Sequence, residues 1–131
     1  MAKPIVVGYI PTPEGEAALD RAIKEAAAHQ TKLLAVNVIH DDGSTIDERY
    51  VPDDAAAKIR ARLEDTGAEF EMVKVNAQDV AEAILEVADQ HDAETIVLGL
   101  RKRSRVGKLI LGSIAQRVLM DAKTSVLAVR A

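Results

Sequence analysis

The residues with the clearest chemical potential lie in one stretch, Gly99 to Ser113, in which glycine positions enclose a cluster of cations. Five lysine or arginine side chains and no acid occur between Arg101 and Lys108, although the whole chain has a formal net charge of −4. A glycine at a strand end lets the main chain turn or approach a ligand closely. The stretch therefore predicts a site for an anionic, phosphate-bearing ligand.

The last glycine of the stretch, Gly112, stands with Ser113 directly before an expected helix. The free N–H groups and positive dipole end of a helix N-terminus form an anion site. The Ser113 hydroxyl can cap this helix and donate to a phosphate oxygen. The cations nearest the first glycine are Arg101, Lys102 and Arg103. The same residues can also form only a turn, a cap and a solvated loop, but their clustering at the expected ligand edge favours phosphate binding.

The elements that must position this stretch alternate between strands and helices. Apolar runs predict strands at 4–10, 32–39, 69–75, 95–98 and 125–129. Helical spacing predicts helices at 13–29, 53–66, 79–90 and 113–122. Thr12 and Asp79 are expected N-caps, and Gly67 is expected to end the second helix. The strand at 69–75 is the most polar, so we expect it at a sheet edge.

This alternation predicts an α/β domain, a parallel sheet with right-handed crossovers and helices on both faces. Ligands bind such sheets beyond the carboxyl ends of strands, where the strand order reverses. The loops after Ile10, Ile39, Val75 and Leu98 are therefore the relevant ones. The chain of 131 residues has no repeat or linker, and we expect one domain, 1–131.

Composition limits the compartment and the partners. The chain has no cysteine, which agrees with a reducing compartment, and we expect a cytoplasmic protein. No run approaches the roughly 20 apolar residues of a membrane span. The acidic net charge argues against general nucleic-acid binding.

Several enzyme classes lack their sequence fingerprints here. The dinucleotide-binding glycine motif is absent after the first strand, and no Walker loop occurs. A receiver domain needs an aspartate at the end of the third strand, where this chain has Val75-Asn76. The histidines stand apart near element ends: His29, His40 and His91. The acids of the 41–52 loop are expected to be solvated rather than to bind a metal: Asp41, Asp42, Asp47 and Glu48. We assign no catalytic residue, and slow ATP hydrolysis stays open without an identifiable base.

The stretch from Gly99 to Ser113 resembles the nucleotide signature of the universal stress protein family, G-x2-G-x9-G-[ST]. The flanks TIVLGL, GKLILGSIAQRVL and TSVLAV agree with that family. The resemblance implies a flavodoxin-like, Rossmann-like domain with a five-stranded parallel sheet of order 3-2-1-4-5 and four helices. It also implies, in one branch, binding of ATP or another adenine nucleotide such as AMP or cyclic AMP. A homodimer would form through the last strand, at Val126, Leu127, Ala128 and Val129.

The resemblance also implies roles for single residues. Gly99 would line the phosphate region, Gly112, Ser113 and the Ile114 main chain would contact phosphates, and Val38 would offer main-chain groups to adenine. Pro11 and Thr12 follow Ile10 at the place of the family's D-G-[ST] tripeptide, so the carboxylate found there in the binding branch is missing. Lys102 replaces the second signature glycine, where its side chain can block the main chain or reach a phosphate.

The sequence thus predicts a stress-response protein that binds an adenine nucleotide or a related phosphate ligand at the carboxyl edge of the sheet. The alternative is a dimeric interaction module that binds no nucleotide, supported by Ile10 in place of the acid and by the apolar last strand. An interface could also use Ile114, Val118 and Leu119, but we expect these residues to form the core stripe of the fourth helix rather than an interface. The downstream partner stays open.

Overall fold

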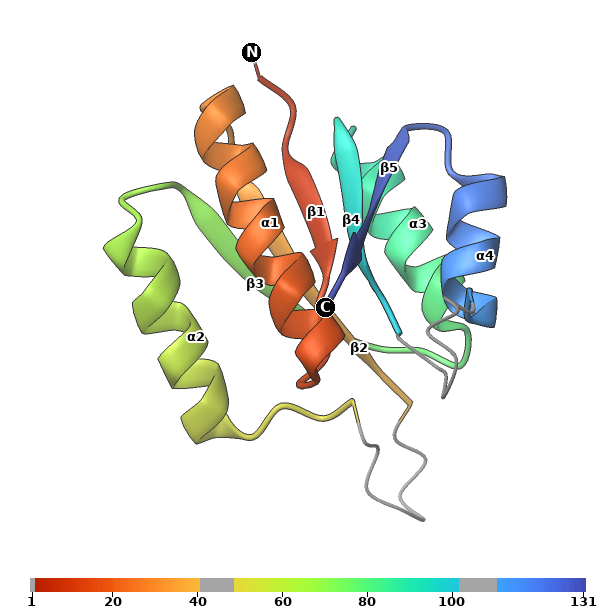
Figure 1. Cartoon of the computed structure of the whole chain (residues 1–131), viewed down its shortest axis with the longest axis horizontal. Helices are drawn as coiled ribbons and strands as arrows, with labels where there is room; N and C mark the ends of the chain where they lie inside the picture. Colours follow the sequence, from red (N-terminus) through yellow and green to blue (C-terminus); the bar gives the residue numbers. More distant parts are fainter. Residues whose placement is uncertain (1, 41–48, 102–110) are drawn as a thin grey trace.

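The computed structural model describes residues 2–40, 49–101 and 111–131. Strands and helices alternate strictly along these residues (Figure 1). The strands are β1 (Ile5–Gly8), β2 (Leu33–Ile39), β3 (Phe70–Asn76), β4 (Thr95–Leu100) and β5 (Ser125–Arg130). The helices are α1 (Pro13–His29), α2 (Asp53–Asp65), α3 (Val80–Gln90) and α4 (Ser113–Asp121).

The strands form one parallel sheet in the order β3-β2-β1-β4-β5. Ile5 at the start of β1 pairs with Leu33 of β2 on one side and with Thr95 of β4 on the other. The strands that follow β1 in the chain extend the sheet on one side, through β2 to β3, and the last two strands extend it on the other side, through β4 to β5. The strand order therefore reverses between the neighbouring strands β1 and β4. The flavodoxin-like order that the family resemblance implies is confirmed, and the polar strand β3 lies at an edge as predicted from its sequence.

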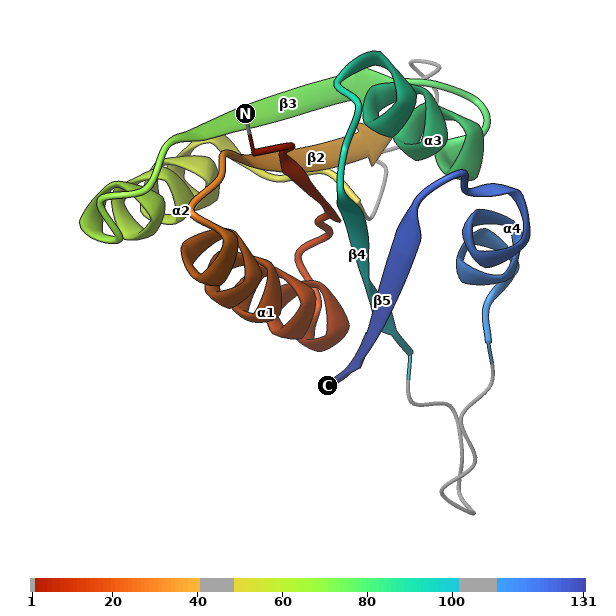
Figure 2. The ribbon, with the colours of Figure 1, turned by 90° about the horizontal axis from the view of Figure 1, so that it is seen from above.

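Two helices cover each face of the sheet, α1 and α2 on one side and α3 and α4 on the other (Figure 2). Because strand side chains alternate between faces, Val7 packs toward α1 while its neighbour Val6 packs toward α3. The inner strands β1 and β4 are buried on both sides, which explains their unbroken apolar runs.

The helix starts follow the sequence at two places and differ at a third. Thr12 caps α1 by accepting from the Gly15 N–H (3.1 Å), and Asp79 caps α3 by accepting from the Glu82 N–H (3.0 Å). The cap of α4 is Gly112, not Ser113, which is the exposed first helical residue. Gly112 adopts an extended conformation and its carbonyl already accepts from the Gln116 N–H (2.9 Å). Among the described residues, no side chain therefore caps the first turn of α4.

Two strand ends also differ from the prediction. β4 continues to Leu100 because Gly99 and Leu100 still pair with Val129 and Arg130 of β5, so Gly99 lies within the strand. β1 ends at Gly8, earlier than predicted, because the chain turns at Ile10, whose carbonyl accepts from the Thr12 N–H (2.8 Å). Gly67 has a φ of 70° just after α2, which confirms it as the residue that ends this helix.

Candidate functional site

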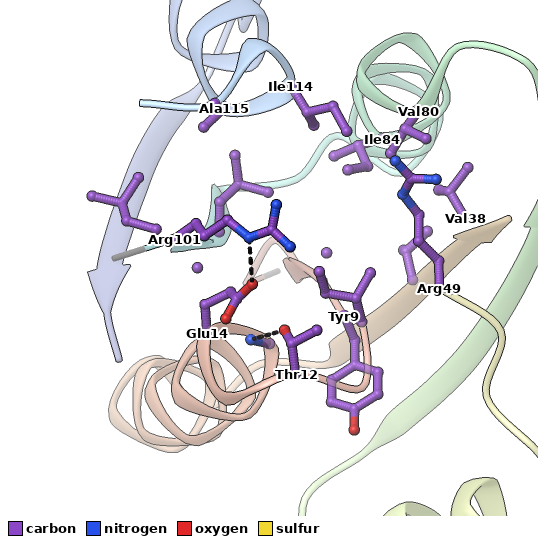
Figure 3. A pocket seen from close by; sticks show the side chains of 18 residues that line it. Tyr9, Thr12, Glu14, Val38, Arg49, Val80, Ile84, Arg101, Ile114 and Ala115 are labelled. Atoms are coloured by element: carbon purple, nitrogen blue, oxygen red, sulfur yellow. Dashed lines mark hydrogen bonds and ion pairs between the residues drawn. The ribbon is translucent and has the colours of Figure 1, made fainter. Parts of the chain in front are cut away.

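A cavity of about 230 Å³ opens at the carboxyl edge of the sheet, between the ends of β1 and β4. Its floor is apolar and includes side chains from β2, α3 and β4: Val36, Val38, Ile84 and Leu98. The first turns of α1 and α4 form its walls, with Thr12 and Glu14 on one side and Ile114 and Ala115 on the other (Figure 3). Parallel sheets bind ligands at this position, where the strand order reverses.

The structure brings most of the predicted binding residues to this cavity. Those that line it are Thr12, Val38, Gly99, Arg101, Gly112 and Ile114. Pro11 and Ser113 are exposed and are not part of the lining, because the cavity wall is made by their neighbours. Lys102 and Arg103 lie outside the described residues, as do Asp41, Asp42, Asp47 and Glu48.

A carboxylate does lie in the cavity, although none was expected. Glu14, in the first turn of α1, lines the cavity, and its side chain is only 13% exposed. Its Oε1 is 3.8 Å from Nε of Arg101, at the end of β4. Figure 3 shows the two side chains meeting at the mouth of the cavity. The first turn of α1 thus places a carboxylate in the lining of the cavity.

Gly99 explains why α1 comes so close to β4. A Cβ at residue 99 would lie 2.1 Å from the Glu14 carbonyl oxygen and 3.0 Å from the Glu14 Cβ. A Cβ at Gly15 would similarly lie 1.8 Å from the Ile10 carbonyl oxygen. Helix packing therefore requires glycine at 99 independently of any ligand, and it fixes the main chain of Glu14 beside the cavity.

Arg49 reaches the cavity from the segment that follows β2. Nδ2 of Asn37 donates to the carbonyls of Tyr9 (2.9 Å) and Arg49 (2.8 Å), which ties this segment to the end of β1. Figure 3 places the Arg49 side chain on the same side of the cavity as Val38 and Val80. Arg49 could not be predicted as a cavity residue from the sequence, because nothing in its local pattern shows that Asn37 holds it there.

The main chain of Val38 points past the end of β1. The Ile39 carbonyl accepts from the Ala77 N–H beside β3 (2.9 Å), so the odd-numbered residues of β2 turn their main-chain groups toward β3. The Val36 carbonyl accepts from the Tyr9 N–H (2.8 Å), so the even-numbered residues turn toward β1. Val38 lies further along β2 than Val36, beyond the last residue of β1, so its main-chain N–H and carbonyl face the space past the end of that strand.

The Tyr9 side chain turns away from the cavity into a polar cluster between α1 and α2 (Figure 3). Its hydroxyl donates to Glu16 (2.5 Å), and Arg62 donates to Glu16 (2.8 Å) and to Asp20. Burial and then the bond to Glu16 raise the pKa of Tyr9 well above its usual range. Burial by itself would raise the pKa of Glu16, but the bonds from Tyr9 and Arg62 outweigh it and lower that pKa. Tyr9 therefore remains a protonated donor.

The described residues include three histidines and no cluster of candidate metal ligands. The histidines are exposed and well separated: His29, His40 and His91. Within residues 2–40, 49–101 and 111–131, no group of three or more His, Asp or Glu side chains is arranged to hold a metal ion. No helix in this part of the chain is long and apolar enough to cross a membrane.

Comparison with known proteins gives the family. The model of the universal stress protein family matches residues 1–130. A universal stress protein of Mycolicibacterium smegmatis is 40% identical over 126 residues, which cover 96% of each chain. A universal stress protein structure from Archaeoglobus fulgidus is 26% identical with a TM-score of 0.74 and 98% of each chain covered. A universal stress protein solved in complex with cAMP is 25% identical with a TM-score of 0.77, again with 98% of each chain covered. This chain, with its 3-2-1-4-5 sheet, therefore belongs to the universal stress protein family.

Proposed function

We propose that this protein binds an adenine nucleotide, or a closely related phosphate ligand, in the cavity between β1 and β4. The observation that carries the proposal is the combination of an apolar floor with the uncapped N-terminus of α4 at the reversal point of the sheet. A ligand with an aromatic base and a phosphate matches both parts. The cAMP complex of the similar universal stress protein supports the same class of ligand.

The apolar end of the cavity is suited to the base. Val36, Val38 and Ile84 are buried and present aliphatic carbons to a planar ring. The Val38 N–H and carbonyl can pair with polar atoms at the edge of adenine, because they point past the end of β1. This assignment makes Val38 a main-chain contact, so its side chain matters only for packing.

The phosphate belongs at the first turn of α4. The N–H groups of Ser113 and Ile114 precede the first intrahelical bond, which Gln116 makes to Gly112. With no side-chain cap, these donors and the positive helix end are suited to an anion. Arg101 lines the same cavity, and Lys102 and Arg103 follow it in the sequence.

Calorimetric titration with ATP, ADP, AMP and cyclic AMP tests the proposal, and we expect at least one to bind with a Kd below about 1 mM. Gly112→Val is the decisive variant, since a Cβ at residue 112 meets no atom within 4 Å and would enter the open space beside the phosphate donors. Leu111→Val is the matched control, because Leu111 is exposed and does not line the cavity. We expect Gly112→Val to lose binding while Leu111→Val keeps it. Absence of binding in the wild type, or equal affinity in both variants, would refute the proposal.

A second candidate function is a dimeric interaction module. β5 lies at the sheet edge, and its central residues Val126 to Val129 are only half-buried. A second copy could pair there and extend the sheet. We propose that residues 1–131 form one universal stress protein domain, which acts as a homodimer in the cytoplasm. Nucleotide binding and dimerisation are compatible, because the cavity and the β5 edge are different surfaces.

A further inference from the structure

Two helix N-termini meet at the cavity, and they differ in chemistry. The first turn of α1 is capped by the Thr12 hydroxyl and includes the acids Glu14 and Glu16. The first turn of α4 has no side-chain cap and no acid. Since a carboxylate repels a phosphate, the anionic end of a ligand is directed to α4 and away from α1.

Glu14 is the acid that faces the ligand space. Among the described residues it is the only acidic side chain in the cavity lining, and only 13% of it is exposed to solvent. Its main chain is fixed over Gly99 by the close packing of α1 on β4. The packing of α1 on β4 therefore fixes the main chain and Cβ of Glu14 beside the cavity.

The ion pair with Arg101 leaves the Glu14 carboxylate with capacity to accept hydrogen bonds from further partners. The N–O separation of 3.8 Å is longer than the roughly 2.7–2.9 Å of a charge-assisted hydrogen bond. An ionised carboxylate accepts about four hydrogen bonds and donates none. It therefore pairs best with the hydroxyl donors of a ligand, and it has a strong need for them because it is largely shielded from water.

We propose that Glu14 recognises the sugar hydroxyls of the bound nucleotide and so selects ribose over a sugar that lacks them. The proposal rests on the proposed function. It follows from the lining of the cavity, because a ligand that reaches from Val38 to the first turn of α4 crosses a space whose facing wall is the first turn of α1 (Figure 3). The sugar is the middle part of such a ligand, and the Glu14 side chain points into this space (Figure 3). Glu14 thus supplies sugar recognition from the helix that follows β1.

A different role for Glu14 would be only to hold Arg101 near the phosphate. The two roles differ in what they do to selectivity. If the Glu14 carboxylate accepts hydrogen bonds from the sugar hydroxyls, its removal weakens the binding of AMP but not the binding of an analogue without these hydroxyls. If Glu14 only holds Arg101, its removal displaces Arg101 and weakens the binding of both ligands alike, because both carry the same phosphate.

The experiment compares AMP with 2′,3′-dideoxyAMP by calorimetric titration of the full chain. We expect the wild type to prefer AMP by about tenfold or more, the effect of a hydrogen bond to a charged group. Glu14→Met should reduce this preference to about twofold or less. Arg101→Met should weaken the binding of both ligands and keep the preference for AMP over 2′,3′-dideoxyAMP. Glu64→Met, an exposed site on α2 outside the cavity lining, is the matched control and should behave as wild type.

The outcomes separate this inference from the proposed function. Equal wild-type affinity for AMP and 2′,3′-dideoxyAMP would overturn the role of Glu14 and leave nucleotide binding standing, without any need for a variant. A preference that survives in Glu14→Met would overturn it as well. Failure of the wild type to bind either ligand would overturn both.

Discussion

At the scale of single residues, Gly99 and Gly112 belong to the same sequence signature but have different physical roles. A side chain at Gly99 would collide with the Glu14 main chain, with a Cβ–O distance of 2.1 Å, whereas a side chain at Gly112 would enter open space. Gly99 is therefore needed by the fold, and Gly112 keeps the space beside the α4 N-terminus clear.

This contrast predicts unequal effects on stability. Gly99→Ala should lower the free energy of unfolding by about 1–3 kcal/mol, the usual cost of overpacking, because α1 must shift. Gly112→Ala should stay within about 1 kcal/mol of the wild type. Urea denaturation measures both. Equal stabilities of the two variants would contradict the packing role of Gly99.

At the scale of elements, the cluster of Tyr9, Glu16, Asp20 and Arg62 links three of them. Tyr9 follows β1, the two acids lie on α1, and Arg62 lies on α2. The apolar attachment of α2 rests on its buried residues Ile59 and Leu63. Arg62 thus adds a polar tie to a helix with few buried side chains.

Removing that tie should loosen α2 alone. In Arg62→Met we expect faster amide hydrogen exchange in α2, with the exchange of α3 unchanged, because local opening follows local contacts. Lys58→Met, an exposed change on the same helix, is the control. If both variants exchange like the wild type, α2 does not depend on the cluster.

The lowered pKa of Glu16 gives this cluster a pH dependence. Its bonds favour the ionised form, so the stabilisation is complete above the ordinary pKa near 4.5 and is lost as the pH falls toward the lower folded value. Between about pH 5 and pH 3 the wild type should therefore lose more stability than Glu16→Gln. Parallel stability curves for the two proteins over that interval would refute this.

The sequence was sufficient for the elements and only partly for the site. Apolar runs, the caps Thr12 and Asp79, and the polar character of β3 are local features, and the structure confirms them. Glu14 also belongs to a local pattern, but as an acid in a first helical turn it indicates only a favourable dipole interaction. Its position in the cavity depends on how α1 crosses β4, which no local pattern shows.

At the scale of the whole molecule, the β5 edge is the surface we assign to dimerisation. Ala128 lies at mid-strand, half-buried, beside Leu98 of β4. Ala128→Lys would put a charge at the edge where we propose that a second copy pairs, and it should convert the proposed dimer to a monomer in light scattering. Met120→Lys is the comparison, since Met120 is 80% exposed on α4. A dimer that survives the first change but not the second would move the interface to α4.

We propose above all that the cavity between β1 and β4 holds an adenine nucleotide. The most direct measurement is an amide chemical-shift map of the isotope-labelled protein titrated with AMP. We expect saturable shifts at Val38, at Gly99 and Arg101, and in the first turn of α4, with the amides of α2 unchanged. Saturable shifts confined to other surfaces, or none at millimolar AMP, would contradict it.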